Sequence, residues 1–202
     1  MTTTVDFIFD FGSPNAYLSH RVIPEIEVRT GAKFRYVPCL LGGIFKATGN
    51  QPPMLASSSV KNKLDYEQLE MQRFIKRHGL SEFRFNPHFP VNTLTLMRGA
   101  IAAARVNLFE RYIEAGLVAM WERGLKMDDA EVFVDTMNQA GLEGQSLLQA
   151  TREQSVKDEL MANTQTAVER GCFGIPTFFV DDEIYFGKDR LPEVEAALAD
   201  RR

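Results

Sequence analysis

The chain has 202 residues and a net charge of −4, with 45% hydrophobic and 25% charged residues. This composition is typical of a soluble globular protein, and the absence of a long basic run argues against a nucleic-acid surface. No stretch approaches the roughly 20 apolar residues that span a bilayer, and Asp6 and Asp10 interrupt any leader-like apolar run, so we expect a cytoplasmic protein without membrane contact.

The N-terminal part of the chain predicts a strand, a helix and a second strand. The Phe-rich "VDFIFDF" is typical of a buried strand. A helix is expected over Pro14–Thr30, ended by Gly31, with a kink or break at Pro24. "KFRYVPCLL" predicts the second strand. A helix between two strands indicates a parallel β-α-β crossover.

The middle of the chain has a different character. "GGIFKATGNQPP" is rich in Gly, Pro and Asn and predicts a loop. The later segments predict helices joined by loops of a few residues, as in a helical bundle, with the single Trp121 in its core. These segments are "KNKLDYEQLEMQRFIKRHG", "TLTLMRGAIAAARV", "LFERYIEAGLVAMWERG", "DDAEVFVDTMNQAG", "EGQSLLQAT" and "SVKDELMANTQTAVERG".

The C-terminal part returns to strands. "IPTFFV" and "EIYFG", separated by a turn at 181–182, predict a hairpin, and a last helix is expected over 191–199. The simplest architecture is one α/β domain built from both ends of the chain, 1–42 and 172–202. The helical segments 43–171 would then be an insertion.

Ser13 stands at the tip of the first strand-to-helix turn, directly before Pro14. A serine N-cap followed by proline at the first helical position is a common helix start. The same hydroxyl at a helix N-terminus could stabilise an anion. Asn50 is open to similar alternatives, as a turn residue or a ligand contact, and Asp189 could cap the last helix or bind a ligand.

The sulfur and imidazole groups indicate no metal site. Cys39 and Cys172 are far apart in sequence and form neither a C-x-x-C pair nor a metal-ligand spacing. The three histidines are scattered along the chain. We therefore expect both cysteines to be packing residues, and no bound metal.

Four motifs occur in order along the whole chain: "DFIFDFGSPNAYL", "LLGGIFKATGNQPP", "GCFGIPTFFV" and "YFGKDRL". Together they resemble the family of kappa-class glutathione transferases and 2-hydroxychromene-2-carboxylate isomerases. The resemblance implies a DsbA-like fold, in which a thioredoxin-like α/β domain carries a large all-helical insertion. Redox members of that fold carry C-x-x-C where this chain has "SPNA", so dithiol–disulfide exchange, which needs two sulfurs, is excluded there.

The resemblance also implies glutathione as cofactor. Ser13 would hydrogen-bond its sulfur, and Pro14 and Asn15 would line the same turn. A thiolate is the reactive form of a thiol. The hydroxyl and the helix N-terminus would both favour that form, so Ser13 is expected to stabilise the thiolate and not to be the nucleophile itself.

The rest of the implied glutathione site comes from later segments. Asn50 would hold the peptide from the far side, and Ile175 would pair its backbone with the cysteinyl backbone. Asp189 would meet the α-ammonium group of the γ-glutamyl end, beside Phe186, Gly187 and Lys188. The resemblance implies a cis bond before Pro176, whereas the base rate for proline favours trans.

Two further residues bear on the second substrate. Lys46 could meet an anionic group such as a carboxylate. Phe89 matches a position at which isomerases of this family are expected to carry a tyrosine, so its missing hydroxyl bears on which substrate is bound.

Three functions remain open. The first is a glutathione-dependent isomerase of 2-hydroxychromene-2-carboxylate type in aromatic catabolism, in which the thiolate adds to the substrate enone and is released. The second is a kappa-class transferase, in which glutathione is consumed by an electrophile. The third is a non-catalytic thioredoxin-like binding protein or chaperone. The resemblance favours the isomerase, with a small aromatic or electrophilic substrate, and implies a homodimer.

Overall fold

The computed structural model describes residues 3–199. Within them the elements follow the order β1 (Thr4–Phe9), α1 (Pro14–Thr30), β2 (Lys33–Pro38), α2 (Leu41–Thr48), α3 (Pro53–Ala56), α4 (Lys63–His78), α5 (Leu94–Arg105), α6 (Phe109–Trp121), α7 (Ala130–Gln139), α8 (Gly144–Ala150), α9 (Gln154–Glu169), β3 (Thr177–Val180), β4 (Glu183–Phe186), the 3-10 turn η1 (Lys188–Arg190) and α10 (Leu191–Ala199). None of the helices in this part of the chain is both long and apolar enough to span a bilayer.

The strands form one mixed sheet in the order β2-β1-β3-β4. β1 pairs parallel with β2, with α1 as the connection, whereas β1 with β3 and β3 with β4 are antiparallel pairs. The central strands β1 and β3 are buried along nearly all of their length. Strands from the two ends of the chain therefore share one sheet, which confirms the α/β arrangement predicted from the sequence.

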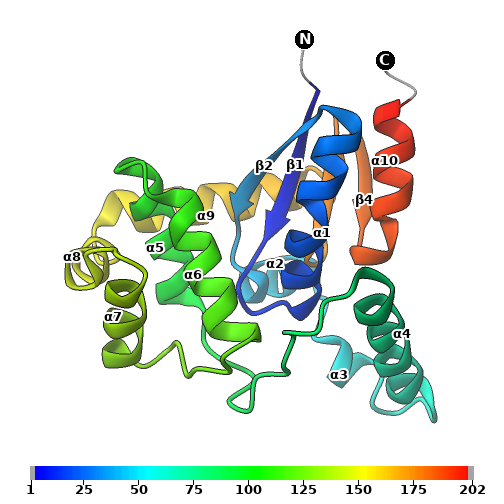
Figure 1. The fold of residues 1–202 in the computed structure, drawn as a ribbon, viewed down its shortest axis with the longest axis horizontal. Coiled ribbons are helices and arrows are strands. Elements are labelled where there is room, and N and C mark those ends of the chain that lie inside the picture. Colours follow the sequence, from blue (N-terminus) through cyan, green and yellow to red (C-terminus); the bar gives the residue numbers. More distant parts are fainter. Residues whose placement is uncertain (1–2, 200–202) are drawn as a thin grey trace.

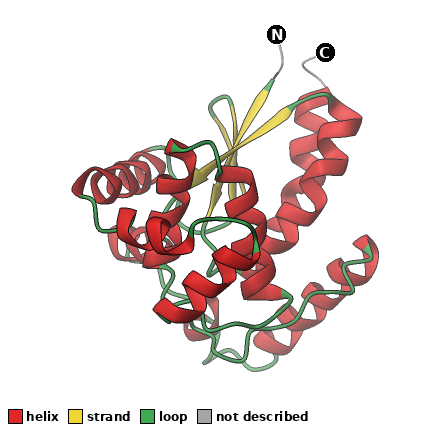
Figure 2. Cartoon of the chain, turned by 60° about the vertical axis from the view of Figure 1, so that its left-hand side comes forward, coloured by secondary structure: helices red, strands yellow, loops and turns green. Residues whose placement is uncertain are grey.

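The helices flank this sheet. Figure 1 shows α5 to α9 gathered at the left, α1 beside α10 at the right, and α4 below them. Figure 2, from another side, shows the strands between these groups of helices. Trp121 is fully buried, as predicted. The helices from α2 to α9 all lie between β2 and β3 in sequence, but the division into a domain of 1–42 and 172–202 and an insertion of 43–171 stays a prediction.

The loop predicted over "GGIFKATGNQPP" is wrong for its first part, because α2 runs over Leu41–Thr48. Glycine lowers helix propensity, and the glycine pair of this segment suggested a loop. Packing overrides that preference here. Ile44 is fully buried, and a Cβ on Gly43 would lie 3.1 Å from Cγ2 of Thr164 in α9, so glycine allows the two helices to approach. Gly49 then ends α2 with a left-handed φ of 68°.

Of the kink or break expected at Pro24, the break is wrong. α1 continues without interruption from Pro14 to Thr30 and ends at Gly31, as expected. Proline removes one intrahelical hydrogen bond, but Val22, Ile23 and Ile26 on either side of it are buried. Their packing keeps the last turns of α1 helical.

The outer edge of β2 has hydrogen-bond partners within the chain at both of its ends. The N–H of Lys33 points toward β1, so the N–H of Phe34 points outward, where Oε1 of Glu27 accepts it at 2.8 Å. At the other end of the strand Pro38 has no N–H, and its carbonyl accepts from Nδ2 of Asn163 at 3.3 Å. Both ends of this edge therefore have internal partners.

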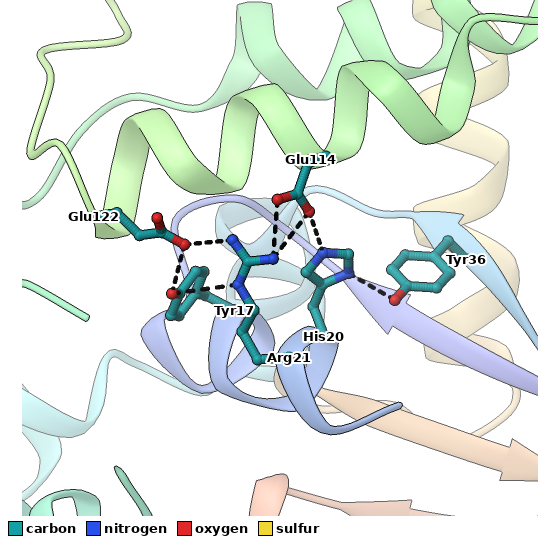
Figure 3. A network of polar contacts seen from close by, with 6 residues as sticks. All are labelled: Tyr17, His20, Arg21, Tyr36, Glu114 and Glu122. Atoms are coloured by element: carbon teal, nitrogen blue, oxygen red, sulfur yellow. Dashed lines mark hydrogen bonds and ion pairs between the residues drawn. The ribbon is translucent and has the colours of Figure 1, made fainter. Parts of the chain in front are cut away.

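A polar network joins α1 to α6 and β2 (Figure 3). It consists of Tyr17, His20, Arg21, Tyr36, Glu114 and Glu122. Glu114 accepts from Nη1 of Arg21 at 2.9 Å and lies 3.0 Å from Nε2 of His20. Arg21 also pairs with Glu122, and Nδ1 of His20 is 2.7 Å from the Tyr36 hydroxyl. These contacts hold the helix that carries Ser13 against α6.

This network makes acid stability depend on Glu114. Hydrogen bonding to His20 and the charge of Arg21 lower the pKa of Glu114 to about 2, against the opposing effect of burial. A carboxylate whose pKa is lowered by folding stabilises the protein above its unfolded pKa of about 4.3, and this contribution is lost as the pH falls toward the folded pKa. We expect Glu114→Gln to lower the melting temperature at pH 7 and to matter less and less between about pH 5 and pH 2. Melting curves by circular dichroism would measure this, and a difference that does not change with pH would contradict it.

Candidate functional site

Ser13 caps α1 and also contacts the other end of the chain. Its Oγ accepts from the N–H of Ala16 at 3.2 Å and donates to the carbonyl of Ile175 at 3.1 Å. Pro14 follows in the first helical turn, and Ser13 is 4% exposed. The cap and the contact with the C-terminal segment therefore coexist in one hydroxyl. Folding brings together two predicted site residues that are 162 positions apart.

The Ile175–Pro176 bond is cis. The base-rate expectation of a trans bond is wrong at this position, because tertiary contacts select the isomer in an ordered segment. The cis bond implied by the family resemblance is confirmed. The carbonyl of Pro176 accepts from the N–H of Gly187 at 2.9 Å, so the segment after β4 lies beside the segment that faces Ser13.

The N-terminus of α1 favours an anion. Its first turn contains no acidic residue, so the partial positive charge of the helix is not compensated there. The side-chain oxygen of Asn15 is buried and has no hydrogen-bond partner among the described residues. A buried acceptor without a partner costs free energy. We therefore expect a donor from a ligand or from solvent at this atom.

Asn50 ties the end of α2 to the segment before the cis-proline. Its Nδ2 donates to the carbonyl of Phe173 at 2.7 Å. The ring of Phe173 packs on Phe186, with centroids 4.5 Å apart, and each of the two residues is 43% exposed. A Cβ on Gly174 would lie 2.8 Å from the Phe186 ring, so any other residue there would require this half-exposed ring to move. The predicted residues Asn50 and Phe186 are thus joined through Phe173, which sequence reasoning missed.

Lys188 and Asp189 form an unequal ion pair. Nζ of Lys188 lies 2.7 and 2.8 Å from the two carboxylate oxygens of Asp189, and 4.9 Å from the ring centroid of Phe74 in α4. The Lys188 side chain is 5% exposed and that of Asp189 is 62% exposed. A buried ammonium requires a polar partner. Lys188 therefore orients a carboxylate that remains open to solvent and to a ligand.

Lys46 and Phe89 are placed differently. Lys46 lies exposed in the last turn of α2, and no hydrogen bond or ion pair joins its ammonium to another described residue. Phe89 packs with Phe85 and Trp121, at 5.2 and 6.1 Å between ring centroids. Nε1 of Trp121 donates to the carbonyl of Phe11 at 2.7 Å. Phe89 is thus linked through Trp121 to the turn that precedes Ser13.

Asp10 and Thr93 are not among the predicted site residues, yet they support the Ser13 turn. The Asp10 carboxylate accepts from the N–H groups of Gly12 and Leu41, each at 2.8 Å, and from the Thr93 hydroxyl at 2.6 Å. For Asp10, the sequence signal that could have indicated this role is its position directly after a buried strand. No feature of the sequence singles out Thr93.

The two cysteines do not supply a thiolate. Both are buried and free, and burial raises the pKa of each thiol above its usual range. Cys172 donates its S–H to the carbonyl of Gly174 at 3.2 Å, which fits a packing role. Within residues 3–199, no group of three or more metal-ligating side chains comes together.

A groove of about 1270 Å³ lies on another part of the molecule, between β2, α1, α5, α6 and α9. None of the predicted site residues lines it. Its charged side chains largely neutralise one another, since Asp6 lies 2.7 Å from both Arg35 and Arg170, and Lys33 lies 3.3 Å from Glu27. The unpaired acceptor of Asn15 and the open carboxylate of Asp189 favour the Ser13 region as the candidate active site.

Comparison with known proteins covers nearly the whole chain. Residues 4–199 match the family model of the DSBA-like thioredoxin domain. The chain is 28% identical to 2-hydroxychromene-2-carboxylate isomerase of Sphingobium xenophagum, over 99% of this chain and all of the relative. It is 26% identical to glutathione S-transferase kappa 1 of Rattus norvegicus, over 98% of this chain and 91% of the relative.

Solved structures agree with these relatives. A structure of 2-hydroxychromene-2-carboxylate isomerase superposes with a TM-score of 0.84 at 26% identity, covering 98% of this chain and 95% of the other. A probable DsbA oxidoreductase from Streptomyces coelicolor, at 16% identity and a TM-score of 0.72, shares the fold. The predicted DsbA-like thioredoxin fold and the resemblance of the sequence motifs are both confirmed.

Proposed function

Because this chain belongs to the family of DSBA-like thioredoxin domains, we propose that it is an enzyme that activates glutathione at the Ser13 turn. The observation that carries the proposal is the Ser13 hydroxyl, held at the N-terminus of α1 and against the carbonyl before the cis-proline. The relatives named as an isomerase and as a glutathione transferase support it.

The residues around Ser13 fit a γ-glutamyl peptide. Asp189 offers an exposed carboxylate to the α-ammonium group, and the buried Lys188 holds that carboxylate in place by contacting both of its oxygens. Asn50 donates to the carbonyl of Phe173, which precedes the cis-proline in sequence, and the Phe173 ring packs on Phe186. The site therefore has a complementary group for the positive charge of the γ-glutamyl end.

The Ser13 proton can serve two partners in turn. In this structure Oγ donates to the Ile175 carbonyl. When the hydroxyl rotates to donate to a sulfur atom, that carbonyl becomes free to accept an N–H from the peptide backbone of the ligand. Binding of the sulfur at Ser13 and pairing of the peptide with Ile175 would then occur together.

Bound glutathione would supply a thiolate, which adds to an electrophilic carbon of a second substrate. Ser13 donates a hydrogen bond to the charged sulfur, and the uncompensated N-terminus of α1 adds favourable electrostatic potential. Both contributions lower the pKa of a thiol, whose free value is about 8.5. The protein's own part is therefore to hold the sulfur and keep it deprotonated near neutral pH.

For the second substrate we propose an aromatic compound of the 2-hydroxychromene-2-carboxylate type, isomerised without net use of glutathione, in the catabolism of aromatic compounds. The similarity to the Sphingobium xenophagum isomerase over its full length supports this choice. Lys46 is exposed and free to pair with a substrate carboxylate, and Phe89 is the proposed aromatic contact. A cytoplasmic homodimer belongs to the same proposal.

Binding of glutathione is the first test. We expect glutathione and S-methylglutathione to raise the melting temperature, because a ligand at 100 times its Kd stabilises the folded state by about 2.7 kcal/mol. Only glutathione should add a thiolate absorbance band near 240 nm at pH 7. If neither compound stabilises the protein and no band appears, the chain is instead a thioredoxin-like binding protein or chaperone.

The second substrate separates the two enzymatic functions. With 2-hydroxychromene-2-carboxylate, an isomerase forms product while the total glutathione concentration stays constant. With an aryl halide, a kappa-class transferase consumes one glutathione for each conjugate formed. Measuring free thiol during both reactions decides between them, and turnover of the aryl halide alone would contradict the isomerase proposal.

A further inference from the structure

A single buried carboxylate contacts three segments of the proposed site. Asp10 directly follows β1 and is 1% exposed. One of its oxygens accepts from the N–H of Gly12 at 2.8 Å and from the hydroxyl of Thr93 at 2.6 Å. The other accepts from the N–H of Leu41 at 2.8 Å. One donor lies in the β1–α1 turn, the second at the start of α2 and the third at the N-cap of α5.

Each of these segments carries a residue of the proposed site. Gly12 precedes Ser13 in the β1–α1 turn, and Leu41 begins α2, which ends just before Asn50. Thr93 is the N-cap of α5 and ends the connection that contains Phe89. We propose that Asp10 is a positioning residue that sets the distances between these three segments. The assignment to a glutathione site rests on the function proposed above.

The geometry fits an ionised carboxylate. Two oxygens meet three donors, so every contact is satisfied only when both oxygens accept. Burial raises the pKa of Asp10, and the bonds from Leu41, Thr93 and Gly12 oppose that rise. A Cβ on Gly12 would lie 3.3 Å from an Asp10 oxygen and 3.3 Å from Cγ2 of Thr93, so the glycine allows this close approach.

An amide cannot replace this carboxylate. Asparagine has one oxygen and one NH₂ group, so either the N–H of Gly12 or that of Leu41 would face a donor. One of the two segments must then move away. Asp10→Asn changes the side-chain volume very little, and its effect would come from this lost complementarity.

The first arm of the test measures amide hydrogen exchange in the protein without ligand. We expect Asp10→Asn to speed exchange in segments 11–16, 41–49 and 92–97 together. Asp6→Asn is the matched control, because Asp6 is a second buried acid, in β1, and pairs with Arg35 and Arg170 instead of with the three donors to Asp10. It should leave all three segments as in wild type.

The second arm measures glutathione affinity by calorimetry. Asp10→Asn should raise the Kd about ten-fold or more, which is the loss of one hydrogen bond to a charged group. Asp6→Asn should leave the Kd unchanged even if it lowers the melting temperature. A Kd for Asp10→Asn equal to that of wild type would overturn the positioning role.

The two arms separate this inference from the proposed function. If wild type binds no glutathione, the proposed function fails, and the exchange data alone decide whether Asp10 holds the three segments. If Asp10→Asn does not fold, Thr93→Val serves instead, with faster exchange expected in 92–97 and 11–16. Unchanged exchange in the folded variants would overturn the inference.

Discussion

Ser13→Ala is expected to lower kcat/KM by about 10²- to 10³-fold, the usual cost of removing one preorganised donor to a developing or bound anion. The variant should still fold. It loses the side-chain cap on Ala16, which is worth about 1 kcal/mol, and the contact with Ile175. A large catalytic effect with a small effect on stability would distinguish an activating hydroxyl from a helix cap.

The same variant should shift the pH dependence of thiolate formation. Without the Ser13 donor, we expect the pKa of bound glutathione to move up toward the free value of about 8.5. Titration of the 240 nm band in wild type and Ser13→Ala measures this. Ser19→Ala is the matched control, since Ser19 is a buried serine of the same helix that donates to the Asn15 carbonyl at 2.8 Å. If Ser13→Ala and Ser19→Ala titrate alike, Ser13 has no role in activation.

Trp121→Ala is expected to cost about 3–5 kcal/mol of unfolding free energy, the range for truncating a large buried aromatic residue. Trp121 is fully buried, and its ring lies 6.1 Å from the Phe83 ring. Its N–H also holds the Phe11 carbonyl, two residues before Ser13. Loss of this side chain should therefore loosen the Ser13 turn in addition to the core.

Chemical denaturation followed by circular dichroism measures the loss of unfolding free energy. Trp121→Phe keeps an aromatic ring but leaves the Phe11 carbonyl without its donor, so we expect a smaller loss of about 1–3 kcal/mol. Phe85→Ala is a control with little expected loss, because Phe85 is 51% exposed. A Trp121→Ala variant within 1 kcal/mol of wild type would show that this core repacks.

The parts of the fold that follow from local rules were predictable from the sequence. Pro14 and Gly31 bound α1 because proline suits a helix start and glycine a left-handed helix end. The last helix was expected over 191–199, as the structure has it. The return to strands after a helical middle indicated that both ends share one domain.

Features that depend on contacts between distant segments were not predictable in this way. α2 contains a glycine pair, and only the approach of Thr164 from α9 explains Gly43. The burial of Lys188 under Phe74 depends on where α4 packs. The three donors on Asp10 come from three places in the chain, and no local pattern links them.

The capped edge of β2 has a consequence for self-association. A sheet grows across two molecules when an edge strand presents a row of unpaired N–H and C=O groups to its neighbour. Here the outward N–H of Phe34 donates to the Glu27 carboxylate. Pro38 has no N–H, and its carbonyl accepts a hydrogen bond from the side chain of Asn163. A second chain therefore finds no continuous ladder at β2. The internal contacts at its two ends therefore disfavour strand addition at this edge.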